Sequence, residues 1–429
     1  MYPNLYYAFR DLFGVEWSGL RFINSFGFFV ALAFLVAAYI LVKELQRKER
    51  GGLLQFSEVK VEVGKPASIT DLAINFLLGF LLGYKFIGLF LTGKGEAVDP
   101  QEFIFSSKGN LPMGIAMAIL FTGLKWWEKN KRKLAKPETR TVRLWPHDRV
   151  GDIVIYAALF GFLGAKIFHN LENWNEFIAS PVEALLSFSG LTFYGGLICA
   201  TLAIWWYARK HKINFKHLCD AAAPALMIAY AIGRIGCQVA GDGDWGILNS
   251  AYVITTDNKI VEAEPDTYKL QLTMNSRFYT NEFNETPLDR IPHKAVKAPF
   301  GLPVWMVAYT YPHNVLNHGV DIRDCTDGQY CRQLPVPVFP TPFYETLMAL
   351  VLFFFLWLIR KKINQAGVLF SIYLIVNGIE RFLIEKIRVN TTYDQLPFRP
   401  TQAELISSGL VILGLALFIY LRRKGQSAA

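Results

Sequence analysis

Long apolar runs separated by short polar connections dominate the chain. A helix needs roughly 20 apolar residues to cross the hydrocarbon core of a bilayer, and runs near that length recur from one end of the sequence to the other. They lie at about 26–45, 69–92, 111–127, 152–168, 187–207, 218–239, 343–359, 367–384 and 404–421. The pattern predicts an all-α polytopic membrane protein with about nine transmembrane helices.

Basic residues indicate how these helices are oriented. Lysines and arginines concentrate in the connections at 43–50, 125–149, 208–217, 360–362 and 422–424. Short loops rich in lysine and arginine stay in the cytoplasm, and with about nine spans all of these connections fall on one side. We therefore expect the N-terminus outside and the C-terminus in the cytoplasm.

One connection is too long for a simple loop. Residues 247–340 are polar and proline-rich, and structureless connections of such length are uncommon. We expect a small extracytoplasmic domain there, inserted between the sixth and seventh predicted helices. The rest of the chain divides into an aromatic interfacial segment at 1–22, a first membrane part at 23–246 and a second membrane part at 341–429.

The first membrane part contains a repeated spacing of an aspartate, a glycine and a lysine within apolar runs. The two sets are Asp71, Gly83 and Lys85, and Asp152, Gly164 and Lys166. Two interpretations stay open. Apolar helices resemble one another without common origin, or an extra hairpin at about 50–130 is a duplicate.

The composition agrees with a membrane protein. Of the 429 residues, 52% are hydrophobic and 18% are charged, whereas soluble domains carry about 25% charged residues. The net charge of +9 could suggest nucleic acid, but the basic residues adjoin apolar runs, as expected for contact with anionic lipid. We therefore expect membrane lipids rather than nucleic acid as partners.

The five cysteines form no CxxC pair, which argues against a structural zinc site or a thioredoxin-like motif. Cys325 and Cys331 lie in the segment assigned to the oxidising side of the membrane, where disulfides persist. The alternative is a zinc site that combines them with His313 and His318, although their spacing is not typical of such sites.

Two arginines interrupt the apolar runs. An unpaired cation near the bilayer centre costs roughly 2.5–3.5 kcal/mol on insertion scales, so Arg234 and Arg381 should have partners. Asp242 follows Arg234 closely, and Glu385 lies four residues after Arg381 on the same helix face. By the predicted topology both arginines approach the outer leaflet, where they would clamp a lipid phosphate. The alternative is internal ion pairs that only hold helices together.

Other polar features have both structural and functional interpretations. Lys166 either contacts a ligand or extends toward the interface. Tyr194 with Gly195 and Gly196 either binds a substrate or forms a close helix contact with an interfacial tyrosine. Asp220, near the start of the run that contains Arg234, is expected to cap that helix.

The stretch Gly233–Gly246 resembles the signature of the bacterial prolipoprotein diacylglyceryl transferases, which reads roughly Gly-Arg-x-Gly-Asn-Phe-x-Asn-x-Glu followed by Gly. The resemblance extends in the same order to 161–169, 191–197, 220–224, 340–345 and 378–388. It implies transfer of the diacylglyceryl group of phosphatidylglycerol to the lipobox cysteine in the signal peptide of a preprolipoprotein. A thioether forms and glycerol phosphate leaves, at the bacterial cytoplasmic (inner) membrane. No metal or nucleotide motif is present, so no cofactor is expected.

The resemblance also implies roles for single residues. Arg234 matches the phosphate-binding arginine and Arg381 the second essential arginine. Glu385 would orient Arg381, Asp242 would pair with Arg234 or accept the thiol proton, and Tyr194 would hydrogen-bond the headgroup or relay the proton. The expected substrate contacts are Arg234, Gly195, Gly196, Gln238, Asn377, Lys166 and Tyr344.

Some positions depart from the family pattern. Tyr194 replaces the histidine of many members, which excludes a histidine base there. Cys237 and Ala240 replace the signature asparagines, and one extra residue lets either Asp242 or Asp244 fill the acidic position. These replacements keep two alternatives open: a non-catalytic paralogue that binds lipid or lipoprotein, and a lipid transporter, which should show repeat-related halves.

Overall fold

The computed structural model describes residues 1–92, 103–104, 106–186, 192–255, 257–283, 287–325, 328–390, 393 and 398–426. The chain forms two compact units. The first comprises Met1–Val15, Ile23–Glu44 and Lys216–Ala429, and the second comprises Glu16–Phe22 and Leu45–Phe215. Parts of the predicted outer loops at 93–110 and 386–402, and the start of the predicted span at 187–207, lie outside the described residues.

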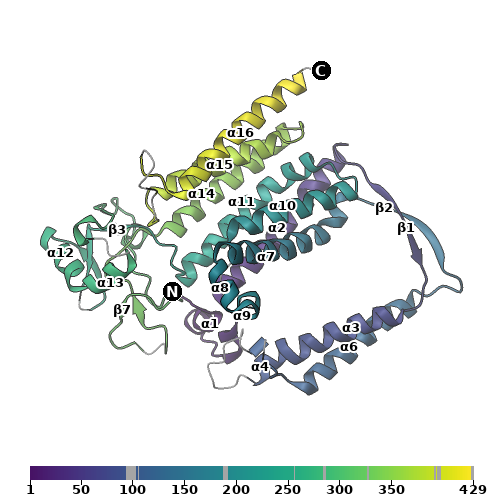
Figure 1. The fold of residues 1–429 in the computed structure, drawn as a ribbon, viewed down its shortest axis with the longest axis horizontal. Coiled ribbons are helices and arrows are strands. Elements are labelled where there is room, and N and C mark those ends of the chain that lie inside the picture. Colours follow the sequence, from purple (N-terminus) through teal and green to yellow (C-terminus); the bar gives the residue numbers. More distant parts are fainter. Residues whose placement is uncertain are drawn as a thin grey trace. The chain divides into compact units, whose positions relative to one another are not determined.

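The first unit contains most of the long helices (Figure 1). They are α2 (Ser25–Arg50, whose last turns belong to the second unit), α11 (Phe215–Ala240), α14 (Thr341–Ile359), α15 (Val368–Glu385) and α16 (Gln402–Gln426). The short helix α1 (Leu5–Phe13) precedes them. Buried residues of α11, α14 and α15 form one apolar core: Ala223, Met227, Ala231, Ala349, Phe353, Leu356 and Leu369. This core fixes the helices that carry the charged residues described below.

Asp220 is fully buried and caps a helix other than its own. The prediction that it caps the helix containing Arg234 is wrong, because α11 begins at Phe215 and Asp220 lies inside it. Its carboxylate accepts hydrogen bonds from the backbone N–H groups of Gly367 at 2.8 Å and Phe370 at 2.9 Å. A carboxylate at the N-terminus of α15 accepts hydrogen bonds from N–H groups that have no partner within the helix, and its negative charge interacts favourably with the helix dipole. Asp220 thereby joins α11 to α15.

Residues between α11 and α14 form a small mixed domain, which we call the inserted domain (residues 247–340) (Figure 1). Its elements are β3 (Leu248–Asn249), β4 (Tyr252–Ile254), β5 (Ile260–Glu262), α12 (Pro265–Met274), α13 (Ser276–Glu282), β6 (His293–Lys294), β7 (Val320–Asp321) and β8 (Arg332–Gln333), with short 3₁₀ turns at Leu288–Arg290 and Val304–Met306. β3 pairs with β6 in parallel, whereas β4 pairs with β5 and β7 with β8 in antiparallel fashion. The domain has its own core, which includes Tyr279, Ile291, Tyr311 and Val336.

Cys325 and Cys331 of the inserted domain form a disulfide. The expected disulfide is therefore confirmed. The alternative zinc site is excluded, because zinc binds the thiolates of reduced cysteines. The disulfide closes a short loop between β7 and β8.

The second unit consists of two helical hairpins joined by a two-stranded ribbon. Its elements are β1 (Ser57–Val63), α3 (Ile69–Leu81), a π-helical turn at Leu82–Ile87, α4 (Gly88–Thr92), α6 (Leu111–Lys131), β2 (Glu138–Leu144), α7 (Val150–Glu172), α8 (Trp174–Ala179), α9 (Pro181–Leu186) and α10 (Phe193–Lys210), with 3₁₀ turns at Ser18–Phe22 and Pro146–Arg149. β1 and β2 are antiparallel, with Ser57 opposite Leu144 at one end and Val63 opposite Glu138 at the other.

Within each hairpin, the two helices pack through residues at corresponding positions. In one, Asn110 N–H, just before α6, donates to the carbonyl of Tyr84 at 2.9 Å. In the other, Thr192 N–H, just before α10, donates to the carbonyl of Ala165 at 3.1 Å. A close backbone contact is also found at corresponding positions in the two hairpins. A Cβ on Gly83 would collide with the Met113 carbonyl, and a Cβ on Gly164 would collide with the Gly195 carbonyl.

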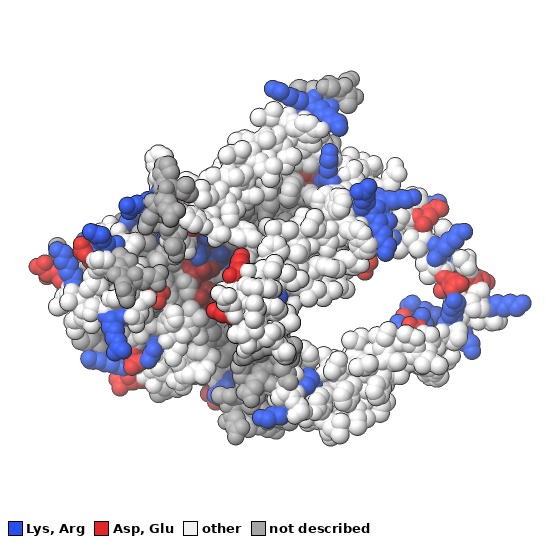
Figure 2. Space-filling model, in the orientation of Figure 1, with Lys and Arg blue, Asp and Glu red and all other residues white. Residues whose placement is uncertain are grey.

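Six helical segments of the described residues are long and apolar enough to cross a membrane. They are Ser25–Arg50, Ile69–Leu91, Pro146–Glu172, Phe215–Ala240, Thr341–Lys362 and Gln402–Lys424. Figure 2 shows that charged side chains gather over the inserted domain and near helix ends, while the visible sides of the long helices are almost free of them. The protein is therefore a predominantly helical, multi-pass membrane protein, as the apolar pattern predicts.

Candidate active site

Three arginines and three carboxylates form one cluster in the first unit, which we call the arginine–carboxylate cluster. They come from the last turns of α11, the loop after it, the start of α14, the end of α15 and the segment that follows α15. The members are Arg234, Asp244, Glu345, Arg381, Glu385 and Arg388.

Glu345 is the common partner of all three arginines. Its carboxylate is fully buried and lies 3.1 Å from Arg234 Nε, 3.2 Å from Arg381 Nη1 and 3.4 Å from Arg388 Nη1. A buried carboxylate loses its hydration, so it is tolerated only with such oppositely charged partners. One carboxylate thus fixes three guanidinium groups at one place.

Asp244 links two of the same arginines from the loop that follows α11. One carboxylate oxygen contacts Arg234, and the other lies 2.5 Å from Arg388 Nη2. Burial alone would raise the pKa of Asp244, but the guanidinium groups of Arg234 and Arg388 outweigh it and hold this pKa below its ordinary value. Asp244 is therefore ionised throughout the physiological range.

The start of α14 and the inserted domain together hold Asp244 in place. Thr341 Oγ1 donates to the Asp244 carbonyl at 2.5 Å, and Gly246 N–H donates to the Phe339 carbonyl at 2.9 Å. The next side chain, Trp245, is buried in the core of the inserted domain, with its ring centroid 5.4 Å from that of Tyr311. The position of the acidic loop thus depends on the packing of this domain.

Arg381 has a second partner within its own helix. Its Nη2 lies 3.0 Å from Glu385 Oε2, the contact predicted from their spacing. The other Glu385 oxygen accepts hydrogen bonds from Asn390 at 2.5 Å and Thr401 at 2.8 Å. Glu385 is thereby fixed from two sides, and it can orient Arg381 as expected.

The cluster combines three fixed positive charges with limited access to solvent. The side chains are 17% exposed for Arg234, 28% for Arg381 and 11% for Arg388. Arg381 is the most accessible of the three. A guanidinium group binds phosphate as well as carboxylate, through paired N–H donors, so a phosphate that reaches Arg381 can share or replace its carboxylate contacts.

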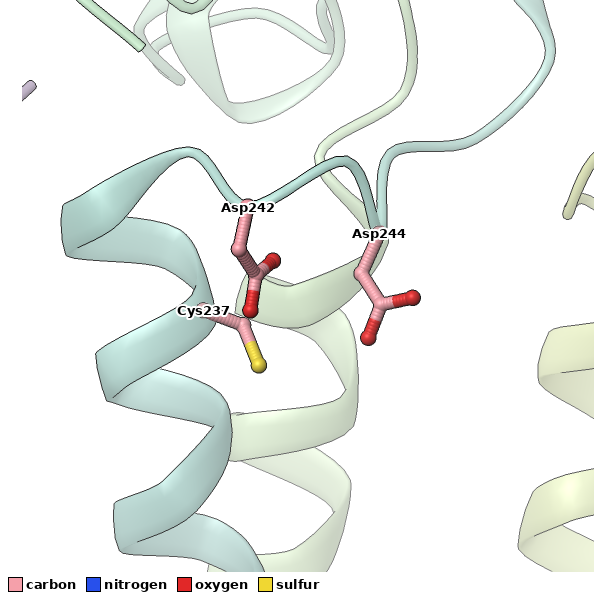
Figure 3. Close-up of side chains that lie close together, drawn as sticks. All are labelled: Cys237, Asp242 and Asp244. Carbon is pink, nitrogen blue, oxygen red and sulfur yellow. The ribbon is translucent and has the colours of Figure 1, made fainter. Parts of the chain in front are cut away.

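Asp242 has a different environment from the one expected. The predicted pairing of Asp242 with Arg234 is wrong, because the extra residue in this loop brings Asp244 to the arginine instead. Figure 3 shows the Asp242 carboxylate turned back toward Cys237 on α11. Its Oδ1 is buried without a hydrogen-bond partner among the described residues. Burial, together with the nearby charge of Asp244, raises the pKa of Asp242.

Cys237, Asp242 and Asp244 bring one potential metal-ligand atom each within 4.8 Å of one another (Figure 3). Asp244, however, already contacts two guanidinium groups. These positive charges oppose a bound cation. We therefore assign no metal to this group of residues.

Two residues that are expected to contact substrate form hydrogen bonds with the inserted domain. Gln238 accepts a hydrogen bond from the Tyr311 hydroxyl at 3.0 Å, and the Tyr344 hydroxyl donates to the Met306 carbonyl at 2.6 Å. Both side chains help to hold this domain against α11 and α14, and their expected contacts with substrate stay predictions. Asn377 is half-buried on α15, and its contact with substrate stays a prediction.

The remaining expected residues belong to the second unit. Lys166 is buried on α7, and Tyr194 is half-buried at the start of α10. Gly195 and Gly196 face α7 so closely that a Cβ would lie 2.6 Å from the Gly164 carbonyl and 2.9 Å from the Gly161 carbonyl, respectively. The close helix contact accounts for both glycines. Roles of Lys166 and Tyr194 toward substrate stay predictions.

Sequence reasoning gave no role to Glu345 and Arg388 and left Asp244 as the alternative to Asp242. A signal was present for each. Asp244 was the second candidate for the acidic position, Glu345 ends the stretch 340–345, and Arg388 follows Arg381 by seven residues, two helical turns in spacing. What the sequence did not indicate is that Glu345 gathers all three arginines.

A cavity of about 250 Å³ adjoins the cluster. Asp244 and Arg388 line it on one side, and side chains of the inserted domain, including Phe278, Tyr279 and Val336, line it on the other. The arginine–carboxylate cluster is therefore not sealed on every side.

Fold and site together define a multi-pass helical membrane protein with a preorganised group of arginines. The chain belongs to the prolipoprotein diacylglyceryl transferase family, whose model matches residues 113–420. A phosphatidylglycerol–prolipoprotein diacylglyceryl transferase of Dehalococcoides mccartyi is 26% identical over 331 residues, which cover 77% of this chain and 96% of the relative. Proteins of the same name from Psychrobacter arcticus and Bacillus cytotoxicus are each 25% identical, covering 71% and 66% of this chain and 85% and 80% of their own lengths.

Proposed function

We propose that this protein transfers the diacylglyceryl group of phosphatidylglycerol to the lipobox cysteine of preprolipoproteins. The names of its relatives and its membership of the family support the reaction. The single observation in the structure that carries the proposal is the contact of Glu345 with Arg234, Arg381 and Arg388. Through this contact, Glu345 holds three guanidinium groups where a phospholipid headgroup would bind.

The reaction is a displacement at a glycerol carbon. The cysteine sulfur forms a new C–S bond, the C–O bond to phosphate breaks, and glycerol phosphate leaves with the electron pair. Negative charge accumulates on the phosphate oxygens in this step. Arg381 and Arg234 stabilise that charge, and because Glu345 and Glu385 hold them in advance, little reorganisation is needed.

The incoming thiol must lose its proton, since the thiolate is the nucleophile. Asp242 is the best acceptor among the residues of the first unit, because burial raises the pKa of its carboxyl and one oxygen lacks a partner among the described residues. Tyr194 is the second candidate, as a relay. Asp244 is unsuited, because two arginines hold its pKa down.

The proposal includes a topology. In addition to the six candidate spans, α6, α10 and α15 are apolar helices of 21, 18 and 18 residues and are proposed to cross the membrane. This gives about nine spans, with the N-terminus and the inserted domain outside and the C-terminus in the cytoplasm. The membrane is the bacterial cytoplasmic (inner) membrane, where preprolipoprotein signal peptides are held.

One specific observation favours a second candidate function. Cys237 and Ala240 stand where the family signature has asparagines, so a paralogue that binds lipid or lipoprotein without transfer is the alternative. The intact set of three arginines around Glu345 supports the enzyme instead.

Purified protein in phospholipid vesicles with labelled phosphatidylglycerol and a lipobox peptide separates these functions. Thioether-linked diacylglycerol on the peptide supports the transferase, and its loss in Arg381→Ala at unchanged membrane insertion ties the reaction to the cluster. Peptide binding without product supports the paralogue, and lipid flux without product supports a transporter.

A further inference from the structure

The cavity beside Asp244 and Arg388 has walls that the transfer reaction does not require. Apolar side chains of the inserted domain form these walls. Three come from α13 and its end, Phe278, Tyr279 and Phe283, and three from the segment before α14, Leu334, Val336 and Val338.

The lining does not suit a phosphate group. Among its charged residues, Asp244 and Glu282 are acidic, and the basic residue, Arg388, already contacts Asp244 at 2.5 Å. Most of the other lining side chains are apolar or aromatic, and an apolar side chain gains from leaving water against them. A volume of about 250 Å³ accommodates a side chain but not a lipid.

The lining also lies beyond the membrane-spanning helices. α11 ends at Ala240, α14 begins at Thr341 and α15 ends at Glu385, whereas the cavity is formed by residues 243–248, 278–283, 334–338 and 388–390. Acyl chains stay in the hydrocarbon core. In the proposed topology this is the outer side of the membrane, where a polypeptide can reach the cavity.

Two segments of the acceptor flank the reacting cysteine. The segment before it is the apolar signal peptide, which lies in the membrane. The segment after it is outside and follows the cysteine directly, so it is the one that reaches a cavity bordered by two members of the arginine–carboxylate cluster.

We propose that this cavity receives an apolar side chain from the first residues after the lipobox cysteine, so that the inserted domain selects among acceptor proteins. The inference rests on the proposed transferase function. Burial of one apolar side chain corresponds to roughly tenfold or more in affinity. We thus expect acceptors with such a residue to have a KM at least about tenfold lower, with little change in kcat.

The test uses the full-length protein in phosphatidylglycerol vesicles and peptides that differ only after the cysteine. One set carries a single leucine at each of the first few positions in a Gly/Ser background, and the matched set carries aspartate there. The wild type should prefer one leucine peptide through KM. Val389→Trp, which fills the cavity from a half-buried lining residue, should abolish this preference while the KM for phosphatidylglycerol stays unchanged.

A second variant guards against loss of folding. Phe278→Ala widens the cavity and should shift the preference from leucine toward tryptophan. Phe300→Ala, which changes a fully exposed phenylalanine of the same domain, is the matched control and should behave as the wild type. Thermal unfolding of each variant establishes that the chain is folded.

The outcomes separate the two proposals. Thioether formation with equal KM for leucine and aspartate peptides, or an unchanged preference in both cavity variants, overturns the selective role of the cavity and leaves the transferase standing. Absence of thioether product with every peptide overturns the proposed function and this inference together.

Discussion

Arg381 on α15 lies 3.2 Å from the buried carboxylate of Glu345 on α14. The contact joins two neighbouring helices through opposite charges, of which the carboxylate is fully buried and the arginine is partly exposed. Because Glu345 also contacts Arg234 and Arg388, its charge both stabilises the bundle and fixes the groups that would receive a phosphate.

Glu345→Gln should lower the free energy of unfolding by about 3 kcal/mol, since it leaves buried guanidinium groups short of a partner. Denaturant unfolding in detergent measures the change. Glu262→Gln is the matched control, because Glu262 pairs with Lys297 at an exposed site and should have little effect. Equal stability of the two variants would show that Glu345 is not the centre of the cluster.

Asp242 and Asp244 should respond to pH with opposite signs. The pKa of Asp244 is below its ordinary value of 3.8 in the folded protein. Its charge therefore stabilises the fold above pH 3.8, and that contribution is lost as pH falls through the lowered pKa. Asp244→Asn should thus be less stable than the wild type at neutral pH, with the difference shrinking in acid.

For Asp242 the pKa is above its ordinary value of 3.8. Ionisation of Asp242 therefore lowers the stability of the folded state. This loss begins as pH rises above 3.8 and reaches its full size above the raised pKa. Asp242→Asn should therefore gain stability relative to the wild type as pH rises, although it should lose transfer activity if Asp242 accepts the thiol proton. Thermal unfolding between pH 2 and 8 tests both variants, and parallel curves would refute the assignment.

Trp245→Ala should uncouple the acidic loop from the inserted domain. Truncation of a buried tryptophan costs about 3 kcal/mol or more, and the adjacent Asp244 should lose its fixed position, so that kcat falls. Trp305→Ala, in the same domain but 42% exposed, is the comparison and should be milder. Activity and circular dichroism of both variants check this, and a full kcat in Trp245→Ala would contradict the positioning role.

The hairpin of α3 and α6 should be dispensable for transfer. Ser57 pairs with Leu144 at the base of the β1–β2 ribbon, so residues 59–142 can be replaced by a two-residue Gly turn without separating the flanking segments. The shortened protein should insert and transfer lipid within a fewfold of the wild type. Complete loss of transfer by a folded, inserted protein would assign the hairpin a direct part in the reaction.

The apolar pattern predicted the helical membrane fold well because hydrophobic length is a local property. The repeated spacing that begins at Asp71 and Asp152 matches a repeated packing feature. Gly83 and Gly164 each lie against the backbone of the partner helix in their own hairpin. We propose on this basis that the α3–α6 hairpin is a duplicate of α7–α10. Likeness of apolar helices alone does not require equivalent contacts between partner helices.

The arginine–carboxylate cluster was only partly predictable. Arg381 and Glu385 share a helix face, so their contact follows from spacing. Glu345 and Asp244 meet the arginines across helices and a loop, and one inserted residue decides that Asp244 rather than Asp242 faces Arg234. Such contacts depend on tertiary packing, as do the hydrogen bonds that commit Gln238 and Tyr344 to the inserted domain.

The most direct test of the central claim compares the affinity of the purified protein for phosphatidylglycerol with that for diacylglycerol, which lacks the phosphate. The wild type should prefer phosphatidylglycerol by about tenfold or more, as expected for charge-assisted hydrogen bonds, and Arg381→Ala should lose most of that preference while remaining folded. An equal preference in wild type and Arg381→Ala would contradict the claim that these arginines receive the lipid phosphate.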